Sequence, residues 1–169
     1  EPTAGTAAAA RLKGIETLEE FFGVNLAQKL AAQGRQADLM VANNVLAHVP
    51  DINDFVMGFA LLLKPEGVAT FEFPHLMQLI EQKQFDTIYH EHFSYLSFST
   101  VNQIFKTNGL SVFDVEALDT HGGSLRVFAQ PTDSGKHPVS KKVAELLNRE
   151  DAAGMNKAAY YQGFQEQAN

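Results

Sequence analysis

A strand–helix–strand pattern in the middle of the chain constrains the fold more than any other feature. Residues 37–42 and 68–73 are apolar runs of strand length, and the second is rich in β-forming residues and ends at Pro74. Between them, Pro50 begins a stretch with apolar residues at helical spacing, which a Lys-Pro-Glu-Gly segment ends. Two strands joined by such a helix run parallel with a right-handed crossover. The pattern therefore predicts an open, doubly wound, mostly parallel α/β sheet whose two strands are buried on both faces.

Weaker patterns on either side predict the remaining elements. Helices are expected over residues 7–13, 26–32 and 99–108, with a brief strand over residues 15–18. Two further extended stretches are joined by a His-Gly-Gly segment, and we expect them to pair as an antiparallel ribbon at the sheet edge; they are residues 111–117 and 124–129.

The expected domain organisation has three parts. Residues 1–130 form the α/β unit, residues 131–140 are a linker by composition, and residues 141–169 form a polar helix without an obvious partner. The chain begins in helix-forming residues without a preceding strand, so we expect it to be a central fragment whose last helix leads toward a missing C-terminal domain.

Composition excludes several classes of function. The formal charge of −7 and the scattered Lys and Arg residues argue against a nucleic-acid-binding surface. The chain has no cysteine, which excludes disulfides, thiolate metal ligands and thiol nucleophiles. Its most apolar run, residues 56–63, is far shorter than the roughly 20 residues of a membrane helix. We therefore expect a cytoplasmic protein that binds neither nucleic acid nor a membrane.

The segment from Tyr89 to Tyr95 is the strongest candidate for chemistry, because it places ionisable side chains between apolar anchors shortly after a strand. An imidazole such as that of His92 can accept a proton at neutral pH. If the segment turns as a helix does, Tyr89 and His92 share a face; if it is extended, His90 and His92 do. The extended geometry favours a metal site with His75 or Asp86 as a third ligand, and a purely structural cluster is the other alternative.

Other candidates follow the predicted strands, where ligands bind in open α/β sheets. Asn43 and His48 follow the first strand, although His48 alone is also consistent with an ordinary loop histidine. Glu1 stands where an earlier strand would end, so its carboxylate suits the hydroxyls of a ribose or, equally, the cap of the following helix.

The stretch from His121 to Arg126 is a second candidate site. Its two glycines, Gly122 and Gly123, let backbone N–H groups approach an anion, and Arg126 is suited to bind a phosphate. The alternative is a Gly-Gly hairpin turn with a solvated arginine.

Together these stretches resemble the S-adenosylmethionine-dependent C-methyltransferases that act on nucleotide-activated keto-deoxysugars. The similarity covers residues 1 to about 130, and its most specific parts are the Tyr-His-Glu-His block with the later His-Gly-Gly. Matching stretches occur in the family's order: Glu1-Pro2, Lys13-Gly14-Ile15, Phe21-Phe22, Ala42-Asn43-Asn44, His48-Val49-Pro50, residues 63–67, residues 85–95, and His121-Gly122-Gly123-Ser124 with Arg126. The resemblance implies a Rossmann-like methyltransferase sheet with no metal.

The resemblance also implies roles for individual residues. His92 would remove the proton next to a sugar ketone, Glu91 and Tyr89 would orient it or stabilise the enolate oxygen, and His48 would approach the sugar from the opposite loop. For S-adenosylmethionine, Glu1 would hold the ribose, Glu20 and Phe21 would lie by the adenine, and Asn43 would line the methionine end. His121, Gly122, Gly123 and Arg126 would bind the sugar substrate.

The chain departs from the family pattern in ways that lead to further expectations. A first strand with its glycine-rich loop and a cysteine-rich zinc module, which family members carry, are not found ahead of Glu1. Because that loop is the main cradle for the cofactor, we expect the chain alone to be inactive and to bind S-adenosylmethionine poorly.

Two other functions stay open from the sequence. The chain could be a non-catalytic α/β module that binds a nucleotide-sugar, or a partner chain through an open sheet edge, as in a homodimer. It could also be a metal-dependent lyase or oxygenase that uses His90 and His92.

Overall fold

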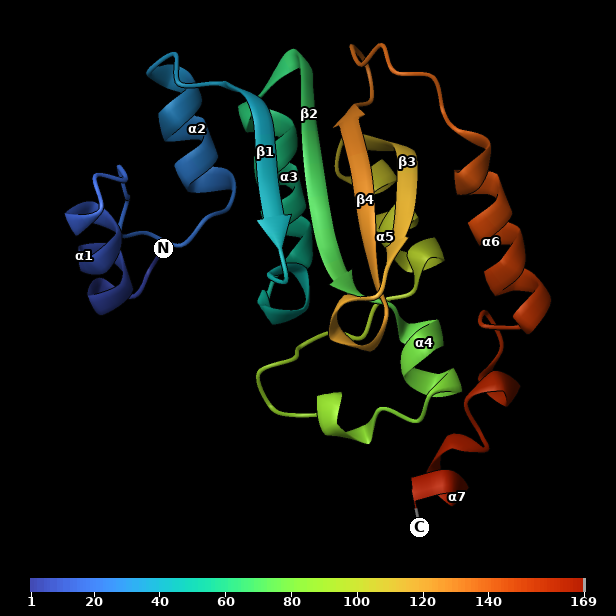
Figure 1. The fold of residues 1–169 in the computed structure, drawn as a ribbon. Coiled ribbons are helices and arrows are strands. Elements are labelled where there is room, and N and C mark those ends of the chain that lie inside the picture. The colour runs from blue at the N-terminus through green and yellow to red at the C-terminus, as the bar shows by residue number, and fades with distance from the viewer. Residues whose placement is uncertain (169) are drawn as a thin grey trace.

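A mixed four-stranded sheet forms the centre of the molecule. In a computed structural model, which describes residues 1–168, the strand order is β1-β2-β4-β3 (Figure 1). The strands are β1 (Ala37–Asn43), β2 (Leu63–Pro74), β3 (Leu110–Leu118) and β4 (Ser124–Pro131). β1 and β2 are parallel, whereas β4 is antiparallel to both of its neighbours, β2 and β3. The predicted α/β fold and the antiparallel edge ribbon are therefore confirmed, in a sheet with one parallel pairing among the described strands.

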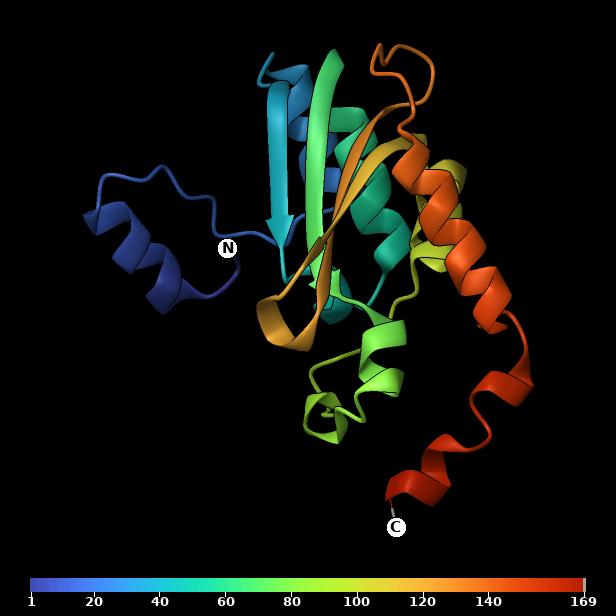
Figure 2. The ribbon, with the colours of Figure 1, turned by 45° about the vertical axis from the view of Figure 1, so that its right-hand side comes forward.

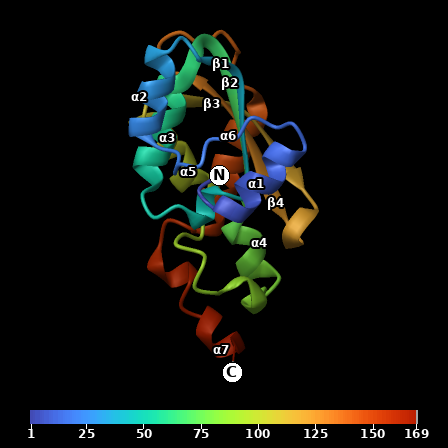
Figure 3. The same ribbon diagram turned by 90° about the vertical axis from the view of Figure 1, so that its left-hand side faces the viewer.

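Helices cover one face of this sheet. Figure 3 shows α2 (Val24–Ala32), α3 (Ile52–Leu62) and α5 (Phe98–Thr107) on one side of the strands and α1 (Ala4–Leu12) on the other. Near the carboxyl end of β2 lie α4 (Leu76–Glu81) and the short 3₁₀ helices η1 (Leu46–His48), η2 (Phe85–Thr87) and η3 (Thr120–Gly122). The last elements are α6 (Lys141–Ala153), η4 (Ala158–Tyr160) and α7 (Phe164–Ala168).

An aromatic core joins the sheet to its helices. Phe71 of β2 is fully buried, and its ring centroid lies 4.6 Å from that of Phe59 in α3 and 4.6 Å from that of Phe105 in α5. Side-chain caps fix the starts of both helices: Asp51 accepts backbone hydrogen bonds at the start of α3, and Ser97 accepts one at the start of α5. Apolar burial and capping together position the loops that follow each strand.

Two predictions are wrong: that the first strand is buried on both faces, and that residues 15–18 form a strand. β1 is not buried on both faces, because Leu39 and Val41 are 60% and 58% exposed on the face that the helices leave open. Residues 15–18 form no strand; this segment is irregular, and its carbonyl group at Thr17 accepts hydrogen bonds from Arg11. A four-residue apolar pattern carries too little information to distinguish a strand from a loop held by a side chain.

The C-terminal helix does have a packing partner, contrary to the prediction from its polar sequence. α6 ends at Ala153, where Gly154 adopts the left-handed conformation, and it packs against β3 and α5. Figure 2 shows it running alongside the β3–β4 ribbon before the chain continues past the carboxyl ends of the parallel strands. Its start is held by Asp114 of β3, which accepts a hydrogen bond from Ser140 at 2.6 Å; this bond holds the pKa of Asp114 below its ordinary value.

None of the helices within residues 1–168 has both the length and the apolar character that crossing a membrane would require.

Candidate active site at the carboxyl end of the sheet

A small cavity beyond the carboxyl ends of β1 and β2 brings together residues from three separate parts of the sequence. Its volume is about 160 Å³. The loop after β1 contributes one histidine, the segment after α4 contributes a tyrosine and a second histidine, and the β3–β4 hairpin loop contributes a third. The lining residues are Asn44, Ala47, His48, Pro74, Thr87, Tyr89, His92 and His121. The sequence places these groups up to 77 positions apart, and the fold places them around one hollow.

His92 has one nitrogen fixed by the backbone and the other available for a proton. Its Nδ1 lies 2.9 Å from the carbonyl oxygen of Thr87, which can only accept, so Nδ1 carries the proton. Its Nε2 lies 3.0 Å from the hydroxyl of Tyr89, which donates to it. The backbone N–H of His92 also donates to the carbonyl of Tyr89, so the segment turns and is not extended here. His92 is therefore oriented as a base through Nε2, with a phenol beside it.

The ring of His48 contacts that of His92 from the opposite loop, at a tilt of 57°. The ring centroids of His48 and His92 are 4.6 Å apart, and Nδ1 of His48 donates to the carbonyl of Glu91 at 3.1 Å. The same loops are joined by a hydrogen bond from the backbone N–H of Phe93 to the carbonyl of Ala47. His48 thus lies on the loop opposite His92, and its expected approach to a sugar stays a prediction.

Glu91 differs from its expected position. Its side chain is exposed and does not line the cavity, and only its backbone carbonyl contacts the histidine pair. Thr87 therefore does the orienting that the sequence suggested for the Glu91 carboxylate. His90 is exposed as well, and within residues 1–168 no three His, Asp or Glu side chains come close enough to hold a metal ion. The metal alternative thus lacks a three-ligand cluster in this part of the chain.

Asn44 lines the site, although the sequence had pointed to its neighbour Asn43. Its backbone has φ of 54°, and its N–H donates to the carbonyl of Glu72 at 2.7 Å. This turn directs the side chain into the cavity, where Oδ1 is buried without a hydrogen-bond partner. Asn43, by contrast, is exposed at the end of β1. The available signal was the Asn type itself, since asparagine tolerates the left-handed region better than most residues.

The hairpin loop closes one side of the cavity and needs both of its glycines. His121 lines the cavity with φ of 52°, and Gly122 and Gly123 also have positive φ. A Cβ atom on Gly122 would lie 2.4 Å from the amide of Gln84, and one on Gly123 would lie 2.8 Å from the side chain of Gln78. The glycines therefore allow the loop to pack closely on α4 and the segment that follows it.

Arg126 is engaged within the protein. Its guanidinium lies 2.9 Å from the carboxylate of Glu72, which is buried and also accepts a hydrogen bond from Thr120. A buried carboxylate with an arginine partner is costly to separate. The structure thus shows Arg126 paired with Glu72 and 36% exposed, and its role toward a substrate phosphate stays a prediction.

None of the four residues expected around a cofactor lines the cavity: Glu1, Glu20, Phe21 and Asn43. The amino group of Glu1 donates to the carbonyl of Leu18, which places Glu1 beside the loop that carries Glu20 and Phe21. The Glu1 carboxylate accepts from the N–H of Thr3, and this hydrogen bond lowers the pKa of Glu1. Glu20 pairs with Lys29 at the surface, whereas the ring of Phe21 is 82% exposed.

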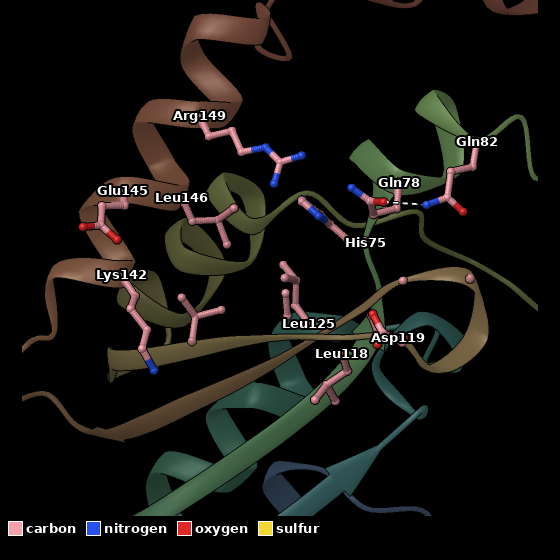
Figure 4. A pocket seen from close by; sticks show the side chains of 15 residues that line it. His75, Gln78, Gln82, Leu118, Asp119, Leu125, Lys142, Glu145, Leu146 and Arg149 are labelled. Carbon is pink, nitrogen blue, oxygen red and sulfur yellow. Dashed lines mark hydrogen bonds between the residues drawn. The ribbon is translucent and has the colours of Figure 1, made fainter.

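A larger cavity of about 550 Å³ lies next to the hairpin loop but does not contain the histidine cluster. Figure 4 shows it between α6, with Lys142 and Arg149, and α4, with Gln78 and Gln82. His75 lies in its wall, directly after Pro74 of the smaller cavity. The two cavities are separated by the end of β2 and the loop around Gly122, which is hydrogen-bonded to Gln84. Size alone therefore does not identify the reactive site.

Family models and a known relative match this chain over most of its length. A family model described as a methyltransferase domain matches residues 6–115, and a model described as the C-methyltransferase C-terminal domain matches residues 119–169. C-methyltransferase NovU of Streptomyces niveus is 37% identical over 164 residues, which is 97% of this chain and 39% of that protein. The chain therefore spans well under half the length of this curated relative.

Solved structures with the same fold have low sequence identity. A protein from Thermotoga maritima, described as an S-adenosylmethionine-dependent methyltransferase and possible histamine N-methyltransferase, has a TM-score of 0.57 at 14% identity. The match covers 78% of this chain and 72% of that one. Magnesium protoporphyrin IX methyltransferase from Synechocystis, solved with S-adenosylmethionine bound, has a TM-score of 0.53 at 15% identity, covering 78% of this chain and 57% of that one. These likenesses show a Rossmann-like methyltransferase fold.

The methyltransferase domain model covers more than half of the chain, and the cavity lies where open α/β sheets bind their ligands. The chain belongs to the methyltransferase domain family, and its C-terminal residues match the C-terminal domain of C-methyltransferases.

Proposed function

We propose that the protein transfers a methyl group from S-adenosylmethionine to a carbon atom next to the ketone of a nucleotide-activated deoxysugar. The observation that carries the proposal is His92, whose Nδ1 is fixed by the Thr87 carbonyl while Nε2 faces a phenol in a cavity beyond the sheet. A carbon acid needs a base of this kind beside a group that stabilises the enolate oxygen. The family models and the relative NovU support transfer to carbon.

The chain's own residues would carry out the proton transfer. Nε2 of His92 accepts the proton as the C–H bond next to the ketone breaks. The electron pair of that C–H bond moves into the enolate. The Tyr89 hydroxyl, 3.0 Å from Nε2, would turn from Nε2 to donate to the enolate oxygen as charge develops there, which frees Nε2 for the proton. The His48 ring contacts the His92 ring and limits the orientations open to it. The enolate carbon then forms a bond to the methyl group.

S-adenosylmethionine would supply that methyl group on a positively charged sulfur, which departs as a neutral thioether. Three exposed residues have side chains that suit it. The exposed ring of Phe21 offers a surface for the adenine, one Glu1 carboxylate oxygen is free for a ribose hydroxyl, and Asn43 stands at the end of β1. Glu20 would lie by the adenine, with one carboxylate oxygen paired to Lys29 at the surface.

The acceptor binds in the cavity between Asn44 and the histidines. Asn44 Oδ1 is buried without a partner, so a hydroxyl or amine of the acceptor would satisfy it. A sugar offers such groups next to its ketone. The His121 loop closes the cavity on another side, and Gly122 and Gly123 act by letting this loop pack closely.

A single substitution tests the base. His92→Asn keeps a donor near the position of Nδ1 and removes Nε2, and His90→Asn is a matched control at an exposed neighbour. With full-length protein, labelled S-adenosylmethionine and a nucleotide keto-deoxysugar, we expect His92→Asn to lose roughly 10²–10⁴-fold in methyl transfer. His90→Asn should retain near wild-type transfer. Unchanged transfer in His92→Asn would refute the proposal, and nucleotide-sugar binding without any transfer would favour the non-catalytic module.

A further inference from the structure

The proposed chemistry leaves one buried pair unused, formed by His75 and Glu150. These residues are 3% and 1% exposed, and Nε2 of His75 lies 2.7 Å from the carboxylate of Glu150. We propose that this pair is a positioning unit that holds the walls of the reaction cavity in register, and that methyl transfer depends on it. Its catalytic consequence rests on the proposed function, whereas its effect on the cavity's geometry does not.

The backbone around His75 connects three cavity segments. His75 directly follows Pro74, which lines the cavity, and its N–H donates to the carbonyl of Gly123 in the hairpin loop. The next residue, Leu76, donates to the carbonyl of Leu96, at the end of the segment that carries the catalytic tyrosine and histidine. A rotation of this one residue would therefore move three walls of the same cavity.

Glu150 extends the same connection to α5. Its two carboxylate oxygens accept from the backbone N–H groups of Phe98 and Ser99, at 2.6 and 2.7 Å. These are among the first N–H groups of α5, which have no partner within the helix. The carboxylate thus caps α5 from α6, two residues after Leu96, and binds His75 with the same oxygen that contacts Phe98.

The charge state of the pair agrees with this arrangement. Burial alone would raise the pKa of Glu150, but the hydrogen bonds from His75 and from the α5 backbone outweigh it and hold the pKa below its ordinary value. Glu150 is therefore a carboxylate at neutral pH, and a carboxylate can only accept. The Nε2 atom of His75 must be its donor, which fixes both the tautomer and the ring orientation of His75.

A hydrophobic pair of similar size would serve packing equally well or better, because buried ion pairs contribute little net stability. Such a pair instead fixes the relative positions of β2, α5 and α6, because its hydrogen bonds are satisfied in only one arrangement of these elements. A role in positioning accounts for the pair, and a role in packing alone does not.

The test compares His75→Leu, which removes the donor, with His75→Gln, whose side-chain amide can place a donor near Nε2. Val143→Ala is the stability control, because Val143 is buried in α6 and is outside the cavity. His137→Leu controls for loss of a histidine elsewhere, since His137 stacks on Phe113 at the ribbon. All variants are compared at equal amounts of folded protein.

Two readouts separate positioning from packing. The first is the nuclear Overhauser contact between the rings of His48 and His92, which needs neither donor nor acceptor; it should weaken in His75→Leu and return in His75→Gln. The second is methyl transfer, where kcat should fall by about tenfold or more in His75→Leu with KM changed by less than about threefold, as expected for a misplaced base. His75→Gln should recover kcat, and the two controls should keep it.

Retention of the ring contact in folded His75→Leu would overturn the proposal, as would an equal loss of the contact in Val143→Ala. If His75→Leu does not fold, Glu150→Gln gives the same comparison, with a lost contact supporting the proposal and a kept one refuting it. Absence of methyl transfer in the wild-type full-length protein would refute the proposed function and leave the ring-contact result to decide the positioning role.

Discussion

At the scale of single residues, the backbone of Asn44 shows how the site depends on an unusual conformation. Its positive φ turns a residue that follows a strand toward the cavity and leaves Oδ1 buried without a partner. Two other non-glycine residues share this conformation, Lys83 and His121, and only His121 also lines the cavity. Lys83 therefore provides a control for the backbone effect alone.

Asn44→Gly should separate backbone strain from ligand binding. Glycine adopts positive φ readily, so both Asn44→Gly and Lys83→Gly should keep the fold, with stability changed by no more than about 1 kcal/mol. Only Asn44→Gly should weaken acceptor binding, by roughly 5- to 30-fold in KM, because a buried hydrogen bond to the ligand is lost. Steady-state kinetics and thermal unfolding measure both effects. Equal acceptor KM in the two variants would show that the Asn44 side chain does not bind the acceptor.

Glu150 should make stability dependent on pH in the acid range. Its folded-state pKa is lowered, so it binds protons less readily in the folded than in the unfolded protein. Its stabilisation is complete above the unfolded value of about 4.3 and is lost as pH falls through the lowered value. Urea unfolding from about pH 6 to pH 3 should show a shallower loss of stability for Glu150→Gln than for the wild type. Identical pH slopes would contradict this assignment.

Sequence alone identified the histidines of the site but not their orienting groups. His48, Tyr89, His92 and His121 could be chosen because ionisable side chains between apolar anchors are rare in a core. The Thr87 carbonyl could not, since every residue has a carbonyl and only the turn decides which one a histidine meets. The carboxylate of Glu91 was the reasonable choice from side-chain chemistry, and it is exposed.

At the scale of elements, the contact between α2 and α3 depends on Gly58. A Cβ atom there would lie 3.0 Å from the backbone of Gly23 and 3.0 Å from the ring of Phe22. Phe22 in turn packs edge-on against Phe55 and Phe59 of α3. The glycine lets the chain before α2 approach α3 closely enough for these aromatic contacts.

Gly58→Ala should therefore destabilise the protein although alanine favours helices. We expect a net loss of about 1–2 kcal/mol, because the overpacking cost exceeds the helix-propensity gain. Gly5→Ala in α1 is the control: no atom lies within 4 Å of its added Cβ, so it should be neutral or stabilising by up to about 1 kcal/mol. Denaturant unfolding measures both. Equal effects of the two substitutions would exclude the steric explanation.

Elements with long, consistent patterns were predictable, and those fixed by distant contacts were not. The helix now seen at Ile52–Leu62 and the strand at Ala37–Asn43 follow directly from periodicity and capping. The packing of α6 could not be predicted, because one of its two buried residues is the charged Glu150, whose hydrogen-bond partners lie 51 to 75 positions away. The residues next to Glu150 in the sequence do not indicate such distant partners.

At the scale of the whole molecule, the sheet gathers groups that no short motif joins. The parallel strands β1 and β2 end at the same edge, and the β3–β4 hairpin returns His121 to that edge. The site is thus a product of topology, as in other open α/β sheets. We propose that this end of the sheet holds a base, His92, which removes a proton from the carbon next to a ketone.

Deuterium exchange tests that claim most directly, because it requires no methyl donor. A nucleotide keto-deoxysugar is incubated in D₂O with wild-type protein, His92→Asn or His90→Asn, and deuterium at the carbon next to the ketone is followed by NMR. If His92 is the base, exchange occurs with the wild type and with His90→Asn, and it is slower by about 100-fold or more with His92→Asn. Equal exchange by His92→Asn and the wild type would contradict it.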